Sequence, residues 1–160
     1  ALREHADLVM DTSTMAGADV RRLLAGHFTI EEGPDLTATV MSFSYRKGLP
    51  READLVFDVR FLRNPHYVPE LRPLSGMDRD VARYIEEDPA LDQIMGRLDE
   101  LLLDLLPRYA AEGKTYLTVA IGCTGGQHRS VFVAERLASI LEGAGHPVTR
   151  RHRDVNTAGG

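Results

Sequence analysis

One stretch constrains the fold of this chain more than any other. Residues 114–122, "KTYLTVAIG", form a nearly continuous apolar run, which is typical of a strand buried on both faces in the centre of a parallel sheet. A glycine-rich loop, "GCTGGQHRS", follows at once, and a helical pattern runs from about Gln127 to Gly143 or Gly145, where glycine can cap it. Because parallel strands need a crossover between them, this order of strand, loop and helix favours an α/β fold.

The rest of the chain supplies the other elements of such a fold. β-branched and aromatic side chains predict strands over residues 36–45 and 54–62, and residues 146–154 predict a last strand at the sheet edge. Helices are expected over residues 78–87 and 91–110, the second with a leucine-rich stripe on one side. We therefore expect a layered, largely parallel sheet flanked by helices.

Composition bears on the cellular compartment of the chain and on its partners. The chain has 160 residues, of which 43% are apolar and 27% charged, and these values are ordinary for one soluble domain. No apolar run is long enough to span a bilayer, and the single cysteine fits a reducing cytoplasm. The net charge of −5 argues against a surface coated for nucleic acid. We expect a cytoplasmic protein.

The two ends of the chain differ from its middle. The sequence opens "ALREHADLVMDTSTMAG", without an initiator methionine and with a strand pattern at residues 7–11, which suggests a piece of a longer protein. Residues 27–35 contain a Gly-Pro pair and charges, and we interpret them as a linker. We expect one domain over residues 36–155 and a mobile, glycine-rich tail over residues 156–160.

The glycine loop has the composition of an anion site. Backbone N–H groups at the amino end of a helix, together with the helix dipole, bind phosphate readily. Arg129 adds a fork that can hold two phosphate oxygens, and Thr124, His128 and Ser130 add further donors. The loop lacks the Lys-Ser/Thr pair of a Walker A motif and the glycine spacing of a dinucleotide site.

An alternative reading makes Cys123 a nucleophile. The pattern Cys123-x-x-Gly126-x-x-Arg129-Ser130 resembles the signature loop of cysteine-dependent protein tyrosine and dual-specificity phosphatases, in which the cysteine attacks phosphate and the arginine clamps it. The histidine that usually precedes the cysteine is Gly122 here, and Asp58 is the candidate general acid.

A second resemblance covers far more of the chain. The segments "DLVFDVRFLRNPHYVPELRPLSGMD" and "YLTVAIGCTGGQHRSVFVAERLA" resemble the C-terminal domain of the RapZ/YvcJ family, and the similarity covers roughly residues 36–153. Residues 1–30 resemble the end of that family's N-terminal kinase-like domain.

This resemblance implies a fold, a ligand and partners. The fold would be phosphofructokinase-like, and the ligand an amino-sugar phosphate such as glucosamine-6-phosphate. Members of the family bind ATP or GTP through their N-terminal half, so we expect this domain to need no cofactor and to be a sensor without catalytic activity. The best-known members also bind small regulatory RNAs, present them to an endoribonuclease, and form homo-oligomers.

The resemblance also implies site residues. The phosphate would be bound by the loop residues Cys123, Thr124, Gly125, Gly126, His128, Arg129 and Ser130. The sugar would be bound by Asp58, Arg60, Asn64 and His66, where Asp58 supplies a carboxylate for the ammonium. An RNA or anion patch would consist of Arg46, Lys47, Arg150, Arg151, His152 and Arg153.

Two departures from the family pattern bear on the RNA role. Gln127 stands where lysine is frequent, and the end "RRHRDVNTAGG" lacks the lysines of RNA-binding members. An RNA-binding module therefore stays an alternative to the sensor. No group of His, Cys and Asp has the spacing of metal ligands, so no metal site is expected.

Overall fold

The computed structural model describes Ser13, Val20 and residues 36–155. The early strand and helix, the linker, the remnant of a preceding domain and the tail over residues 156–160 lie outside the described residues. The structural findings therefore concern the single domain expected over residues 36–155.

Four strands form one sheet in which every neighbouring pair is parallel. The order across the sheet is β2-β3-β1-β4, so β1 and β3 are central, and β2 and β4 are the edges. Along the chain the strands are β1 (Thr37–Ser44), β2 (Leu55–Asp58), β3 (Tyr116–Cys123) and β4 (Val148–His152). The sheet confirms the predicted α/β class.

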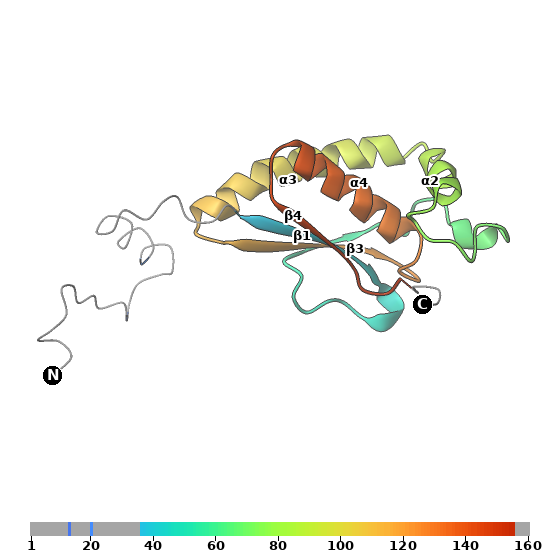
Figure 1. Cartoon of the computed structure of the whole chain (residues 1–160), viewed down its shortest axis with the longest axis horizontal. Helices are drawn as coiled ribbons and strands as arrows, with labels where there is room; N and C mark the ends of the chain where they lie inside the picture. Colours follow the sequence, from blue (N-terminus) through green and yellow to red (C-terminus); the bar gives the residue numbers. More distant parts are fainter. Residues whose placement is uncertain (1–12, 14–19, 21–35, 156–160) are drawn as a thin grey trace, which may run out of the picture.

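One face of the sheet is covered by two long helices (Figure 1). These are α3 (Leu91–Ala111) and α4 (Arg129–Gly143), and the shorter α2 (Arg79–Glu86) precedes them. Val40, Leu117, Val119 and Ile121 of the central strands are fully buried in the core that the helices share. Burial of each such side chain stabilises the fold by roughly 1.5–3 kcal/mol. Among the described residues, no helix is both long and apolar enough to cross a membrane.

The opposite face is covered by the loop between β1 and β2, which lies on the other side of the sheet from α3 and α4 (Figure 1). Met41 and Phe43 point to this face and are fully buried. The Phe43 ring packs edge-on against Tyr45 at a centroid distance of 4.9 Å, and the guanidinium of Arg153 lies 5.5 Å from the Phe43 centroid. The sheet is thus enclosed by helices on one side and by an irregular loop on the other.

The prediction of a strand over residues 54–62 was too long, because β2 ends at Asp58. The Val59 N–H still reaches the Gly122 carbonyl at 3.0 Å, but the Arg60 N–H turns back to the Asp58 carboxylate at 2.9 Å. A side chain that captures a nearby backbone N–H competes with the strand ladder. As a result the chain turns, and the Phe61 side chain, expected to alternate along a strand, is 55% exposed.

Candidate functional site

A cavity of about 420 Å³ lies at the carboxyl end of β3. Its walls come from the loop that joins β3 to α4, from residues 64–73, and from Arg46 after β1. In open α/β sheets, ligands bind beyond the carboxyl ends of the strands, and the volume falls within the range of small-molecule pockets. We take this cavity as the candidate site.

Cys123 is the last residue of β3, lines the cavity and is 3% exposed. Its sulfur accepts a hydrogen bond from the Gly126 N–H at 3.2 Å and lies 3.1 Å from the Ser130 hydroxyl. Gly126 has φ +71°, and a Cβ there would lie 2.9 Å from both the Asp154 Cβ and the Ser44 nitrogen. The position therefore requires glycine for both backbone conformation and space.

A chain of hydrogen bonds connects the loop to the end of the described chain. The Ser44 hydroxyl donates to the Thr124 carbonyl at 2.8 Å, and the Ser44 N–H donates to the Asp154 carboxylate at 2.7 Å. Burial alone would raise the pKa of Asp154, but hydrogen bonds from Arg153 and the Ser44 N–H hold that pKa below its ordinary value. We call these contacts the Asp154–Ser44–Thr124 chain.

Arg129 is the first residue of α4 and is only 5% exposed. Its Nη1 donates to the carbonyl oxygens of Arg60, at 2.5 Å, and Leu62, at 3.1 Å. Its Nη2 lies 3.5 Å from the Thr124 hydroxyl, while its Nε is buried and has no hydrogen-bond partner among the described residues. A guanidinium that lines a cavity and retains a free buried donor is suited to bind an anion there.

His128 precedes α4 and is also buried. Burial lowers the pKa of its imidazole, so the ring is neutral at pH 7. Its Nε2 lies 3.1 Å from the Leu71 carbonyl, which can only accept a hydrogen bond, so Nε2 carries the proton. Nδ1 is then left as an acceptor, which suits a ligand hydroxyl.

The facing wall contains two of the four residues expected to bind the sugar. Asn64 and His66 both line the cavity, and the Asn64 side-chain oxygen accepts the His66 N–H at 3.3 Å. The wall also contains Tyr67, Arg72 and Pro73, which the sequence interpretation did not select. The sequence does show an aromatic residue and an arginine in the proline-rich run after "RNPH", which could have marked them as candidates. Nothing in the local sequence indicated, however, on which side of the cavity that run would lie.

The other two expected sugar residues lie outside the cavity lining. The Arg60 guanidinium donates three hydrogen bonds to the Asp58 carboxylate, from Nε at 2.9 and 3.0 Å and from Nη2 at 2.6 Å, and it lies 4.2 Å from the Tyr45 ring centroid. The hydrogen bond from Arg60 is the main reason that the pKa of Asp58 lies below its ordinary value. Asp58 instead borders an apolar groove beside α3, so the structure does not bring the expected ammonium partner into the site.

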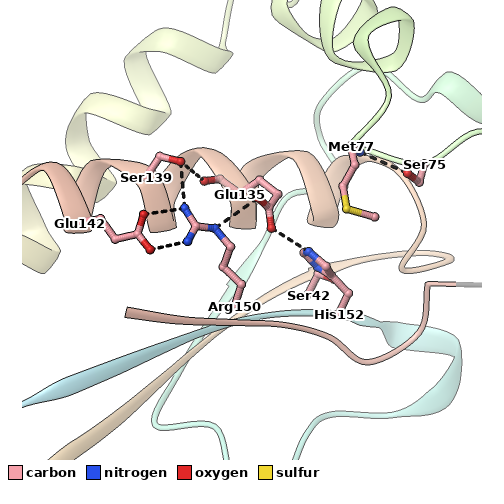
Figure 2. Close-up of polar contacts among 8 residues, drawn as sticks. All are labelled: Ser42, Ser75, Met77, Glu135, Ser139, Glu142, Arg150 and His152. Atoms are coloured by element: carbon pink, nitrogen blue, oxygen red, sulfur yellow. Dashed lines mark hydrogen bonds and ion pairs between the residues drawn. The ribbon is translucent and has the colours of Figure 1, made fainter. Parts of the chain in front are cut away.

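Arg150 and His152, two residues of the expected basic patch, point from β4 toward α4 (Figure 2). Arg150 pairs with Glu142 and Glu135. His152 bridges the Glu135 carboxylate and the Ser42 hydroxyl, each at 2.8 Å. Both side chains thus connect β4 to α4.

The remaining members of the expected patch are dispersed. Arg151 pairs with Glu52 at 3.1 Å, and Lys47 lies 3.4 Å from Asp154. Arg153 pairs with Asp154 and donates to two backbone carbonyls, while Arg46 lines the cavity. The six residues therefore do not form a single surface of unpaired cations. Within the described part of the chain, no three His, Cys, Asp or Glu side chains are grouped to hold a metal ion.

Comparison with known proteins agrees with the resemblance noted in the sequence. The family model for the RapZ C-terminal domain matches residues 36–156. The chain is 58% identical over 97% of its length to a nucleotide-binding protein of Rhodospirillum centenum, covering 47% of that protein. It is 54% identical over 99% of its length to a nucleotide-binding protein of Paramagnetospirillum magneticum, covering 52% of that protein. The chain thus spans about half the length of these curated relatives.

Proposed function

Because this chain belongs to the RapZ C-terminal domain family, we propose that it is a regulatory sensor domain that binds a phosphorylated sugar in the cavity beyond β3. Glucosamine-6-phosphate, which the sequence resemblance implies, is the first ligand to test. The domain itself performs no chemistry in this proposal. Its occupied and empty forms differ in how they engage a partner.

One observation carries the proposal. The Nε of Arg129 has no hydrogen-bond partner among the residues that the structure describes. A buried donor left without an acceptor costs roughly 1–3 kcal/mol, and the residue that carries it also lines the cavity. The amino end of α4 starts at the same residue and adds the favourable field of the helix dipole. Thr124 and Gly125 also line the cavity, on the loop that precedes α4.

The sugar would contact the facing wall. Asn64 and His66 offer donors and acceptors for hydroxyl groups, and the neutral ring of His128 offers an acceptor. Tyr67 is 79% exposed beside the cavity, so its ring is free to cover the apolar side of a sugar. This combination of one anion site and several neutral polar groups favours a sugar phosphate over inorganic phosphate.

The signal would pass to the part of the protein that the relatives possess and this chain does not span. Those relatives are about twice as long and are named nucleotide-binding proteins. We propose that ligand occupancy is transmitted to such a nucleotide-binding half, within a homo-oligomer, or to a small RNA and its endoribonuclease.

Calorimetric titration of the 160-residue chain with glucosamine-6-phosphate tests the proposal. Arg129→Ala should abolish the heat of binding. Because Arg129 also holds the carbonyls of Arg60 and Leu62, Thr124→Val provides a milder variant that should weaken binding without removing those contacts. Arg108→Ala, whose salt bridge to Asp104 is exposed on α3, is the matched control and should bind normally. Absence of heat with the unaltered chain, for this ligand and for inorganic phosphate, would refute the proposal.

The geometry favours binding over attack by Cys123. The Cys123 side chain is 3% exposed, and no carboxylate among the described residues lines the cavity to protonate a leaving group. A phosphatase needs both an accessible thiolate and a general acid. Turnover of an aryl phosphate that is lost in Cys123→Ser would reverse this assignment.

A further inference from the structure

The apolar groove that Asp58 borders has a volume of about 280 Å³ and shares no lining residue with the candidate site. It lies between α3 and the segment that runs from the end of β2 to Leu62. Apart from Asp58 and Arg97, every residue that lines it is apolar. Two of these apolar side chains are well exposed, Phe61 at 55% and Leu101 at 46%. Single exposed apolar side chains are ordinary, but several that line one groove mark an interaction site.

The groove adjoins an open edge of the sheet. Among the described strands, β2 has β3 as its only neighbour, and Phe57 and Asp58 of β2 belong to the groove lining. The Asp54 N–H, just before β2, donates to the Thr118 carbonyl of β3 at 2.9 Å. Because N–H groups alternate in direction along a strand, those of Leu55 and Phe57 point away from β3, where no described strand pairs with them. Such an edge is a template for a further strand.

The unmatched charge of the groove is positive. The Asp58 carboxylate already accepts three hydrogen bonds from the Arg60 side chain. Arg97 is exposed and has no ion pair or hydrogen bond with any residue in the described ranges. A partner that carries an acidic residue would therefore complement the groove, whereas a basic partner would not.

One wall of the groove is fixed before any partner arrives. Arg129 donates from Nη1 to the carbonyl oxygens of Arg60 and Leu62, which flank Phe61 in the turn after β2. Leu62 is only 3% exposed, so the turn is anchored on its inner side while the Phe61 ring stays accessible. A preformed groove loses little conformational freedom when it binds a partner.

We infer that this groove binds an extended segment of a partner protein, with apolar side chains at alternate positions and an acidic residue that pairs with Arg97. The segment would add to the free edge of β2 through main-chain hydrogen bonds, and its alternate apolar side chains would enter the groove. The acidic residue would fix its register. A nucleic acid fits poorly, because its phosphates need several cations and Arg97 is the one unpaired cation of the described lining. This inference does not depend on the ligand of the candidate site.

Selection from random peptides tests the inference. Decapeptides displayed on phage would be selected against the immobilised 160-residue chain, and the affinity of synthesised winners would be measured by fluorescence anisotropy. We expect apolar residues at alternate positions and at least one aspartate or glutamate. Leu101→Lys should weaken binding at least about tenfold, because the peptide would bury a charge. Leu49→Lys, the same change at a leucine that is 59% exposed outside the groove, should leave the affinity unchanged.

Two further measurements test the charge and the strand pairing. Arg97→Glu should weaken the acidic peptides by about fivefold, as expected for an exposed ion pair, and should select basic peptides instead. Methylation of every second backbone nitrogen of a winning peptide should abolish binding in one register and spare it in the other, since only alternate N–H groups would face β2.

Several results would overturn the inference. These are the failure to enrich any peptide, equal affinities for Leu101→Lys and Leu49→Lys, an unchanged charge preference in Arg97→Glu, and equal tolerance of methylation in both registers. Sedimentation velocity covers a different occupant. A dimer of the unaltered chain that Leu101→Lys dissociates and Leu49→Lys does not would assign the groove to a second copy of this chain. Far-UV circular dichroism would verify that both lysine variants are folded.

Discussion

Replacing Gly126 by alanine tests whether the loop between β3 and α4 is packed against Ser44 and Asp154 as described. The added Cβ would meet the Asp154 Cβ and the Ser44 nitrogen at 2.9 Å, and the Ser44 Cβ at 3.0 Å. An L-residue in the left-handed region costs about 1–2 kcal/mol. Overpacking at a well-filled site adds about 1–3 kcal/mol. We therefore expect Gly126→Ala to lower the free energy of unfolding by about 2–5 kcal/mol.

Gly145 provides the control, because it has φ +89° but a Cβ added there would have no described atom within 4 Å. Gly145→Ala should cost only the backbone term of about 1–2 kcal/mol. Urea unfolding followed by far-UV circular dichroism would measure both variants, since the chain contains no tryptophan. The two losses in unfolding free energy should differ by the overpacking contribution of about 1–3 kcal/mol. Equal losses in the two variants would show that the loop is not in close contact with Asp154 and Ser44.

Three further predictions concern single side chains. Asp154→Asn should destabilise the domain by about 1–3 kcal/mol and weaken phosphate binding, because it weakens the acceptor of the Ser44 N–H. Unchanged ligand affinity in this variant would show that the Asp154–Ser44–Thr124 chain does not position the loop. The lowered pKa of His128 means that the unfolded chain takes up a proton before the folded chain does. The contribution of His128 to stability is therefore full above the unfolded pKa of about 6.5 and declines as the pH falls below it. Between pH 7.5 and 5.5, Tm should fall less in His128→Asn than in the unaltered chain. An identical fall in the two proteins would contradict a buried, neutral His128. Cys123→Ser should retain glucosamine-6-phosphate affinity within about threefold, since the contacts of the sulfur lie within the loop itself; complete loss of binding in a folded variant would give the thiol a direct role.

The sequence predicted those parts of the fold that depend on local pattern. The apolar run before the glycine loop became β3, and the helix expected from about Gln127 begins at Arg129. The end of β2 was missed because the Asp58 carboxylate accepts the N–H of Arg60. This contact depends on the conformation of the Asp58 side chain and not on the periodicity of the sequence.

The position of the candidate cavity was predictable where it followed from that same local unit. The loop residues and Arg129 are placed together by the strand, turn and helix that contain them. Tyr67 and Arg72 could not be assigned to the cavity, because their position depends on how residues 64–73 pack over a loop more than fifty residues later. The basic residues of β4 were also ambiguous, since their partners Glu135 and Glu142 lie on α4 and are apparent only once the two elements are packed together.

The order of the strands also determines when this domain can fold during its synthesis. β1 is made first among the described strands, yet its two neighbours in the sheet are β3 and β4, which are made last, and β2 pairs only with β3. A ribosome that has completed β1 and β2 has therefore released two apolar segments that do not pair with one another in the folded domain. Folding dominated by such distant contacts is slow and leaves strand edges open to aggregation. Asp154 accepts the N–H of Ser44 at the end of β1, so this contact can form only after almost all of the described residues have been made.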